Sequence, residues 1–351
     1  MKETPLDIAA PYLPPVPPVP RGYFAGRWAR RVMLLLSVGL CLALAYAYAT
    51  RPDAAAAVTV FPVWAWLAPG LLLTLAGWSP WRSRAAAAVF LLWVTFLAAF
   101  AEEPLSLLRA RHIPTPPAPH IRLPDTSLRV VSLNCSGGRE DAAREALSFH
   151  PDVLLLQEAP GRGVLHRLLE DLFAGEGGMA CAGDTAVLAR GVVRPMPPAA
   201  DLAPFSTSAR VVTPRGAVFF ALSLHLTPPV AREDLWNPDC WREQRENRRA
   251  RAKQTERLAA HLARLPGATP LLVGGDWNAP AGDAVYRPLH PRLHDTFAAA
   301  GVGWGNTVLN DFPVLRIDAI WASHHFRPVG VFARPTRHSD HRLVVCDLRF
   351  P

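Results

Sequence analysis

The chain has 351 residues, enough for roughly two domains and a large buried core. Half of its residues are hydrophobic, and its 36 prolines and 23 glycines exclude a helical bundle that runs from end to end. The net charge is +8, but the part that begins at residue 113 contains 27 basic and 24 acidic residues. This part is therefore not strongly basic, and its charge alone does not indicate a nucleic-acid-binding protein.

Three stretches without a charged side chain lie in the first hundred residues. They cover 32–50, 58–78 and 85–101 and contain 19, 21 and 17 residues. A helix needs about 20 apolar residues to cross the bilayer core, and these stretches lack the polar stripe of a helix in a soluble domain. We therefore expect an all-helical transmembrane region with three helices over 32–101. A signal peptide is the alternative for the first stretch, and a re-entrant helix is the alternative for the third.

The basic residues predict the orientation of these spans, because loops rich in Lys and Arg stay on the cytoplasmic side. Five basic residues lie in the lead 1–31, and Arg82 and Arg84 follow the second stretch, whereas Arg51 stands beside Asp53 after the first. We expect a multi-pass protein of the cell membrane with a cytoplasmic N-terminus and an extracytoplasmic C-terminal domain. The lipid bilayer is its expected partner, and no protein partner is predicted.

Proline-rich segments stand on both sides of the apolar stretches. The segment 11–20 predicts an extended cytoplasmic lead, which we assign to 1–31. The segment 113–120 predicts a stiff linker over 102–127, which would hold the domain 128–351 away from the bilayer.

From residue 128 the sequence changes to short apolar runs, which alternate with turns and amphipathic segments. The runs that predict strands are 128–134, 152–158, 185–190, 217–226, 269–278, 316–323 and 341–350. The segments that predict helices are 140–149, 164–173 and 242–265. Strands mixed with helices in this way predict an α/β fold.

Polar side chains stand at the ends of these predicted strands, and in one case at the start. They are Asn134, Glu158, His225, Asp276, Asn278, Asp340 and His341. A carboxylate in a core needs a partner, so such residues must face water, a cation or another ligand. Their shared position predicts one cleft. Taken singly, each has a structural explanation: Asp276 can cap a turn, Asn278 can begin a helix, and His225 can be a hydrogen-bonded buried histidine.

Six segments, in this order, resemble the endonuclease/exonuclease/phosphatase superfamily. They are LRVVSLN (128–134), LLLQE (154–158), SLHL (223–226), GGDWN (274–278), RIDAI (316–320) and SDHR (339–342). The resemblance covers the domain 128–351. It implies a four-layer α/β sandwich, with two central β-sheets flanked by helices, and divalent-metal-dependent hydrolysis of a phosphate ester.

The resemblance also implies roles for single residues. The family's metal-binding positions match Asn134 and Glu158, and an acidic residue near the metal matches Asp340. The positions that act on the phosphate and the attacking water match Asp276 as base, Asn278 as amide donor, His341 with its partner Asp318, and the additional His225. Carboxylate and amide ligands suit Mg²⁺ better than zinc, with Mn²⁺ as the alternative.

The expected position of the domain outside the membrane decides between substrates. The membrane-bound branch of the superfamily, which includes teicoplanin-resistance proteins, implies a phosphorylated lipid as the substrate. An extracytoplasmic nuclease is the alternative, for which the basic segment 242–257 would serve. An inactive, membrane-anchored binding module is the second alternative. Trp277 and Ala319 depart from the commoner family pattern and are expected to line the side wall of the cleft.

Overall fold

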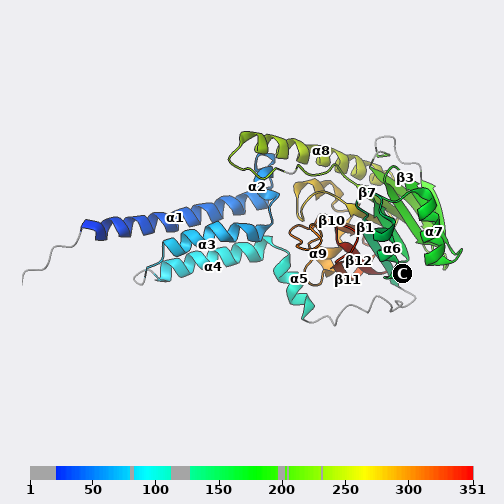
Figure 1. The fold of residues 1–351 in the computed structure, drawn as a ribbon, viewed down its shortest axis with the longest axis horizontal. Coiled ribbons are helices and arrows are strands. Elements are labelled where there is room, and N and C mark those ends of the chain that lie inside the picture. The colour runs from blue at the N-terminus through cyan, green and yellow to red at the C-terminus, as the bar shows by residue number, and fades with distance from the viewer. Residues whose placement is uncertain are drawn as a thin grey trace, which may run out of the picture.

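The computed structural model describes residues 21–79, 83–111, 127–196, 202–203, 205–230 and 232–350. The proline-rich segments 11–20 and 113–120 lie outside the described residues. The chain forms a long helical region, followed by an α/β domain that begins at residue 127 (Figure 1).

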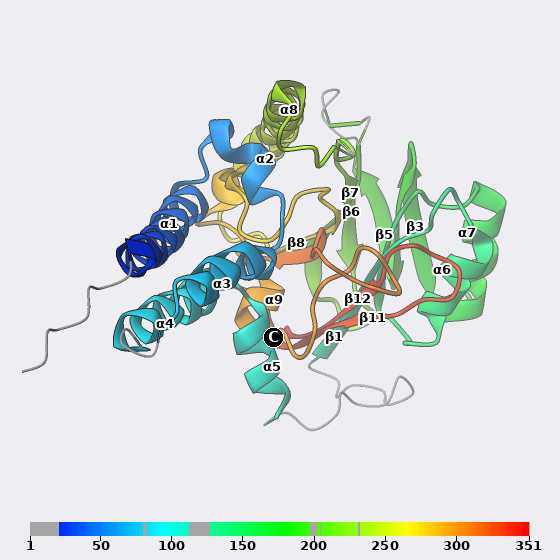
Figure 2. The same cartoon turned by 60° about the vertical axis from the view of Figure 1, so that its left-hand side comes forward.

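Three helices lie side by side in the helical region (Figures 1 and 2). They are α1 (Arg21–Thr50), α3 (Leu67–Ala76) and α4 (Ser83–Phe100). The short elements η1 (Asp53–Ala55), α2 (Ala56–Thr59) and η2 (Val63–Trp66) connect α1 to α3, and α5 (Glu103–Ala110) follows α4.

A small polar group joins the three helices inside their apolar core. The Ser37 hydroxyl donates to the carbonyl oxygen of Gly70 at 2.9 Å, and the Trp93 indole donates to the Ser37 oxygen at 2.9 Å. A Cβ atom at Gly70 would collide with the Trp93 ring. Small residues and interhelical hydrogen bonds of this kind are typical of helices that pack within a membrane.

Among the described helices, α1 is by itself long and apolar enough to cross a membrane, over Gly26–Thr50. The second and third predicted spans take part in bent helix pairs, which qualify only if each pair counts as one span. The pairs bend by 80° and 76° at breaks next to Pro62 and Pro104, because a proline has no backbone N–H to donate to the preceding turn and its ring collides with that turn. The structure therefore supports one crossing helix, and up to three crossings by length and composition.

The α/β domain contains two six-stranded sheets (Figures 1 and 2). The first has the order β11-β12-β1-β2-β4-β3, with β1 and β2 parallel. Its strands are β11 (Arg327–Arg334), β12 (Leu343–Arg349), β1 (Ser127–Asn134), β2 (Val153–Gln157), β4 (Thr185–Arg190) and β3 (Gly177–Ala182). The second has the order β5-β6-β7-β8-β10-β9, with β7 and β8 parallel. Its strands are β5 (Val192–Met196), β6 (Ser206–Val212), β7 (Val218–His225), β8 (Leu271–Asp276), β10 (Asp318–Ala322) and β9 (His294–Asp295).

Helices cover the outer faces of both sheets, so the predicted four-layer sandwich is confirmed. The first sheet packs against α6 (Glu140–Leu147) and α7 (Arg162–Phe173), and the second against α8 (Pro238–Ala263) and η4 (Ala284–Leu289). The helix α9 (Thr296–Ala300) contacts β10 and β11. A third apolar cluster lies between the two sheets, so each interface between layers is an apolar core.

The expectation that Trp277 and Ala319 line the cleft is wrong. Trp277 is fully buried, its indole donates to the Ala319 carbonyl at 3.0 Å, and its ring contacts Tyr286 and Trp321. Successive side chains of an extended chain point to opposite faces. Trp277 therefore points into the core between the sheet and its helices.

The α/β domain lies directly against the ends of the apolar helices. Arg248 of α8 donates to the Pro52 carbonyl at 3.2 Å and to the Thr59 hydroxyl, and Arg249 pairs with Asp53 at 2.6 Å. The linker predicted over 102–127 includes the helix α5, whose Ser106 carbonyl accepts from the Gly303 amide at 2.9 Å. The domain therefore packs directly on the ends of these helices, and the proline-rich part of the predicted linker lies outside the described residues.

A second set of contacts fixes the end of α4 to the domain. Arg316, only 4% exposed in its side chain, pairs with Glu102 at 2.8 Å and with Asp295 at 2.6 Å. Ion pairs without water around them constrain geometry strongly, because separating the charges leaves each one buried alone. The helical region and the domain thus share one polar interface.

Candidate active site

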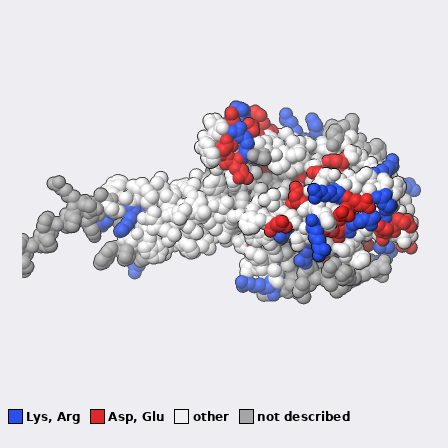
Figure 3. Space-filling model, viewed as in Figure 1, with Lys and Arg blue, Asp and Glu red and all other residues white. Residues whose placement is uncertain are grey.

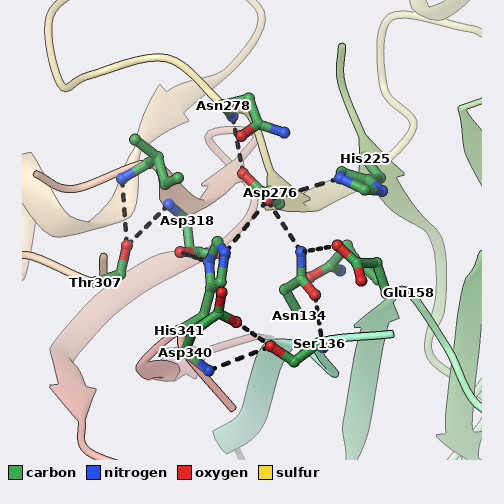
Figure 4. A network of polar contacts seen from close by, with 12 residues as sticks. Asn134, Ser136, Glu158, His225, Asp276, Asn278, Thr307, Asp318, Asp340 and His341 are labelled. Carbon is green, nitrogen blue, oxygen red and sulfur yellow. Dashed lines mark hydrogen bonds and ion pairs between the residues drawn. The ribbon is translucent and has the colours of Figure 1, made fainter. Parts of the chain in front are cut away.

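The two sheets bring their polar strand ends to one place (Figure 4). In the second sheet, β8 lies between β7 and β10, so Asp276 at its end is paired in register with His225 on one side and Asp318 on the other. Gly275 permits this close pairing, because a Cβ atom there would collide with the carbonyl oxygen of Leu224. The Gly-Gly-Asp segment therefore places a carboxylate at the end of a buried strand.

The carboxylate of Asp276 lies at the centre of the group (Figure 4). Its Oδ2 accepts from Asn134 Nδ2 at 3.1 Å and lies 3.8 Å from His225 Nε2 and 3.9 Å from His341 Nε2. Its Oδ1 accepts from the backbone amide of Asn278 at 2.9 Å. Burial, together with the negative charge of Asp318, raises the pKa of Asp276 to about 6. Asp276 is thus a stronger base than an exposed aspartate.

His341 is held by Asp318. Its Nδ1 lies 2.9 Å from Asp318 Oδ2, and both side chains are buried. Burial alone would lower the pKa of His341, but the charge and hydrogen bond of Asp318, with the charge of Asp276, raise it to about 10. The imidazole is therefore a cation at neutral pH and directs its second N–H towards Asp276. The backbone amide of Asp318 donates to the Thr307 hydroxyl at 3.2 Å, which fixes the start of β10.

His225 has a carboxylate partner that sequence reasoning did not assign. Its Nδ1 lies 2.6 Å from Asp184 Oδ2. Burial lowers the pKa of His225, but the hydrogen bond to Asp184 and the charge of Asp276 outweigh it, so the pKa is raised. Asp184 stands in the turn directly before β4. A charged residue beside a tight turn looks like an ordinary surface residue in the sequence, so its role was not apparent.

The predicted metal-binding residues lie on the side of Asp276 that faces β1 and β2. Glu158 Oε1 accepts from Asn134 Nδ2 at 3.1 Å, and Glu158 Oε2 accepts from the Gly137 amide at 2.5 Å. The Asn134 amide oxygen accepts from the Ser136 amide at 2.9 Å, and the Ser136 hydroxyl contacts Asp340. Asn134 therefore directs its amide nitrogen, rather than its oxygen, towards the two carboxylates.

The donor chemistry of this group fits a hard divalent cation. The carboxylates of Glu158, Asp276 and Asp340 are hard oxygen ligands, which Mg²⁺ and Mn²⁺ prefer. Asp276, Asp318 and His341 also offer ligand atoms within 4.8 Å of one another, and the buried Oδ1 of Asp318 has no hydrogen-bond partner among the described residues. A cation would offset the cost of gathering these negative charges in a buried place.

Backbone conformation also marks the site. Glu158 and Asn278 adopt φ angles of 43° and 51°, in the left-handed region that side chains other than glycine rarely occupy. Asn278 donates its side-chain amide to the Leu226 carbonyl at 2.9 Å, which holds the turn after β8. Strained residues of this kind often gather at functional sites. All eight residues predicted from the sequence thus lie in one contiguous group, together with Ser136, Asp184 and Thr307.

Solved structures are similar to this chain. A protein described as an endonuclease/exonuclease/phosphatase family protein of Bacteroides thetaiotaomicron is 17% identical, with a TM-score of 0.50, over 64% of this chain and 98% of its own. The human Nocturnin catalytic domain is 20% identical, with a TM-score of 0.47, over 64% of this chain and 95% of its own. The mannosyl-6-phosphatase Bt3783 of B. thetaiotaomicron is 19% identical, with a TM-score of 0.45, over 64% of this chain and 100% of its own.

Because the Bacteroides thetaiotaomicron family protein is only 17% identical, its similarity supports the fold of this chain and says nothing of its activity. No curated protein matches the chain. The model of the Endonuclease/Exonuclease/phosphatase family matches residues 131–341, which is more than half of the 351 residues and extends from the middle of β1 to His341. With its two-sheet sandwich and its cluster of carboxylates and histidines at the strand ends, the chain therefore belongs to the endonuclease/exonuclease/phosphatase family.

Proposed function

We propose that this protein is a membrane-anchored, divalent-metal-dependent phosphoesterase, which hydrolyses a phosphate ester or pyrophosphate of a lipid at the outer membrane surface. The family consists of hydrolytic phosphoesterases, and the buried carboxylates and histidines supply a base and hydrogen-bond donors. The observation that carries the lipid substrate is the position of the site, whose two rim segments touch the ends of the apolar helices.

The first rim segment follows Asn278. Arg51, just after α1, donates to the Ala281 carbonyl at 3.4 Å, and Arg248 pairs with Asp283 at 2.9 Å while contacting Thr59 of α2. The second segment precedes Asp318. Its Arg316 pairs with Glu102, and its Asn306 donates to Glu103 at 3.1 Å. A lipid in the same bilayer would thus present its phosphate close to the site, and tethering raises its effective concentration.

The residues of the chain have separate tasks in hydrolysis. Glu158, Asp340 and Asp276 would hold the metal ion, which supplies positive charge at the phosphate and makes a bound water more acidic. Asp276 accepts the proton of the attacking water, for which its raised pKa suits it. The cationic His341 donates a hydrogen bond to the phosphate as negative charge builds on its oxygens, and Asp318 keeps it protonated and oriented.

The helical region supports the membrane part of the proposal. The face of this region that Figure 3 shows carries almost no Lys, Arg, Asp or Glu between the N-terminal end of α1 and the α/β domain. We propose three crossings over 32–101, a cytoplasmic N-terminus and an extracytoplasmic catalytic domain over 128–351. The polar contacts of Ser37 with Gly70 and Trp93 hold α1, α3 and α4 together, as expected for helices that cross side by side.

The basic segment of α8 does not favour the nuclease alternative. Arg248 and Arg251 are each 3% exposed and face the interior. Arg249 pairs with Asp53, and Arg242 pairs with Asp239 at 2.7 Å. A track that binds nucleic acid needs basic side chains that are free to contact phosphates. Arg248 and Arg249 instead join the domain to the helical region.

The test compares substrates with the purified full chain in detergent micelles. With Mg²⁺ we expect release of phosphate or a head group from a polyprenyl pyrophosphate or a phospholipid, and a chelator should stop it. Asp276→Asn should abolish this release, whereas Asp171→Asn, an exposed residue on α7, should leave it unchanged. Nicking of plasmid without lipid turnover would support the nuclease. If Asp276→Asn changed no measured property, the inactive binding module would stand.

A further inference from the structure

A hairpin beside the catalytic group carries two exposed apolar side chains at its tip. The backbone of Val308 pairs with that of Leu315, which closes the hairpin. Leu309 is 58% exposed and Phe312 is 71% exposed. Large apolar side chains that are exposed together on a structured loop often mark a contact surface, and the reaction described above gives these two no task.

The hairpin is attached to the catalytic residues. Val308 forms a backbone bridge with His341, and the Asn310 amide donates to the Asp340 carbonyl at 2.8 Å. The Thr307 hydroxyl accepts from the amide of Asp318 at 3.2 Å. The tip residues are therefore part of the rim of the site rather than of a remote surface.

The same hairpin is attached to the helical region through aromatic residues. The indole of Trp304 donates to the Pro313 carbonyl at 2.9 Å, next to Phe312, and its ring lies 6.5 Å from the ring of Trp64 in η2. Trp64 lies in the connection between α2 and α3, where Phe61 and Trp66 also contact each other. Aromatic residues concentrate at the membrane–water interface of membrane proteins, so this contact joins the hairpin to the interfacial end of the helices.

We propose that Leu309 and Phe312 contact the hydrocarbon of the bilayer that holds the chain's own helices. Three observations point to this occupant. Leu309 and Phe312 expose apolar side chains on either side of the polar pair at 310–311. The hairpin continues the aromatic layer through Trp304 and Trp64, and it stands beside His341. A lipid phosphate would then reach the site along a surface that already shields its chain from water. The inference rests on the proposed membrane location and identifies the element that meets the lipid.

The test uses a fluorescent label and needs no turnover. Cys181 is the partly exposed cysteine among the described residues, so Cys181→Ser is the background, and the other four cysteines are buried. Phe312→Cys and Leu309→Cys each receive a nitrobenzoxadiazole label in the full chain, reconstituted in phosphatidylcholine vesicles with doxyl-labelled lipid. Val192→Cys is the matched control, because Val192 is 54% exposed on β5, which lies beside β3 and far from α1, α3 and α4 (Figure 2).

Interfacial side chains lie about 5–10 Å inside the boundary between headgroups and acyl chains. We therefore expect doxyl lipid to quench the labels at 312 and 309 about twofold more strongly than the label at 192. Equal quenching at the three positions, or none at 312 and 309, would overturn the inference. Lipid hydrolysis is measured separately, so a contact without turnover would refute the proposed function and leave the contact established.

Discussion

Replacing Asp318 with asparagine should change the pH range in which the enzyme works. In the native protein Asp318 lies 2.9 Å from His341, and it is the largest of the influences that raise the pKa of His341 from 6.5 to about 10. That interval corresponds to roughly 5 kcal/mol of preference for the imidazolium, at about 1.36 kcal/mol per pH unit. Burial lowers the pKa of His341, and in Asp318→Asn less negative charge remains to counteract that effect. We therefore expect the pKa of His341 to fall to neutrality or below.

The assay is the pH dependence of kcat/KM with a lipid phosphate in micelles. We expect the alkaline limb to move from near pH 10 to about neutral and the rate at pH 8 to fall about tenfold, because a group with a pKa near 7 is only about one-tenth protonated at pH 8. The free energy of unfolding of the wild type should also depend on the charge of His341. The stabilisation that comes from the raised pKa of His341 is fully present below pH 6.5 and is lost as the pH rises through about 10. An alkaline limb that stays in place in Asp318→Asn would refute this account of His341, and Asp171→Asn serves as the control.

Three further outcomes follow from buried charge. Asp276→Asn should stabilise the metal-free protein above pH 6 by about 2–3 kcal/mol, measured as Tm in chelator. The charged, buried Asp276 carboxylate lowers the free energy of unfolding, and this loss develops as the pH rises from 3.8 to about 6. Mg²⁺ at 100 times its Kd should raise the stability of the wild type by about 2.7 kcal/mol, and this gain should shrink in Glu158→Gln. Asp283→Asn should cost about 3 kcal/mol by removing the carboxylate that balances the charge of the buried Arg248, whereas Glu140→Gln in an exposed pair should change the stability far less.

The strands that sequence reasoning identified are those with continuous apolar runs. β1, β2 and β8 are buried on both faces, so hydrophobicity alone reveals them. β3 begins with two glycines, β6 contains Ser and Thr at buried positions, and β11 contains a proline and a glycine. Such strands depend on their neighbours in the sheet, and a single sequence does not contain that information.

The site was predictable for a related reason. A carboxylate or histidine at the end of a buried strand is conspicuous, so Glu158, Asp276 and His341 could be identified in the sequence. Asp184 was missed because it lies in a turn, where acidic residues are common. The interface was missed as well. Arg248 belongs to the basic segment 242–257, and the partners that bury it, Thr59 and Asp283, are distant in the sequence.

The direct contact between the α/β domain and the helices matters for any attempt to produce the domain alone. A fragment that starts at residue 127 would lose Glu102 and Thr59, leaving the guanidinium groups of Arg316 and Arg248 with fewer of the partners that bury them. Both arginines stand in segments that lead to catalytic carboxylates. The soluble piece would therefore relax at its active-site rim, and its catalytic rates would not report those of the intact chain.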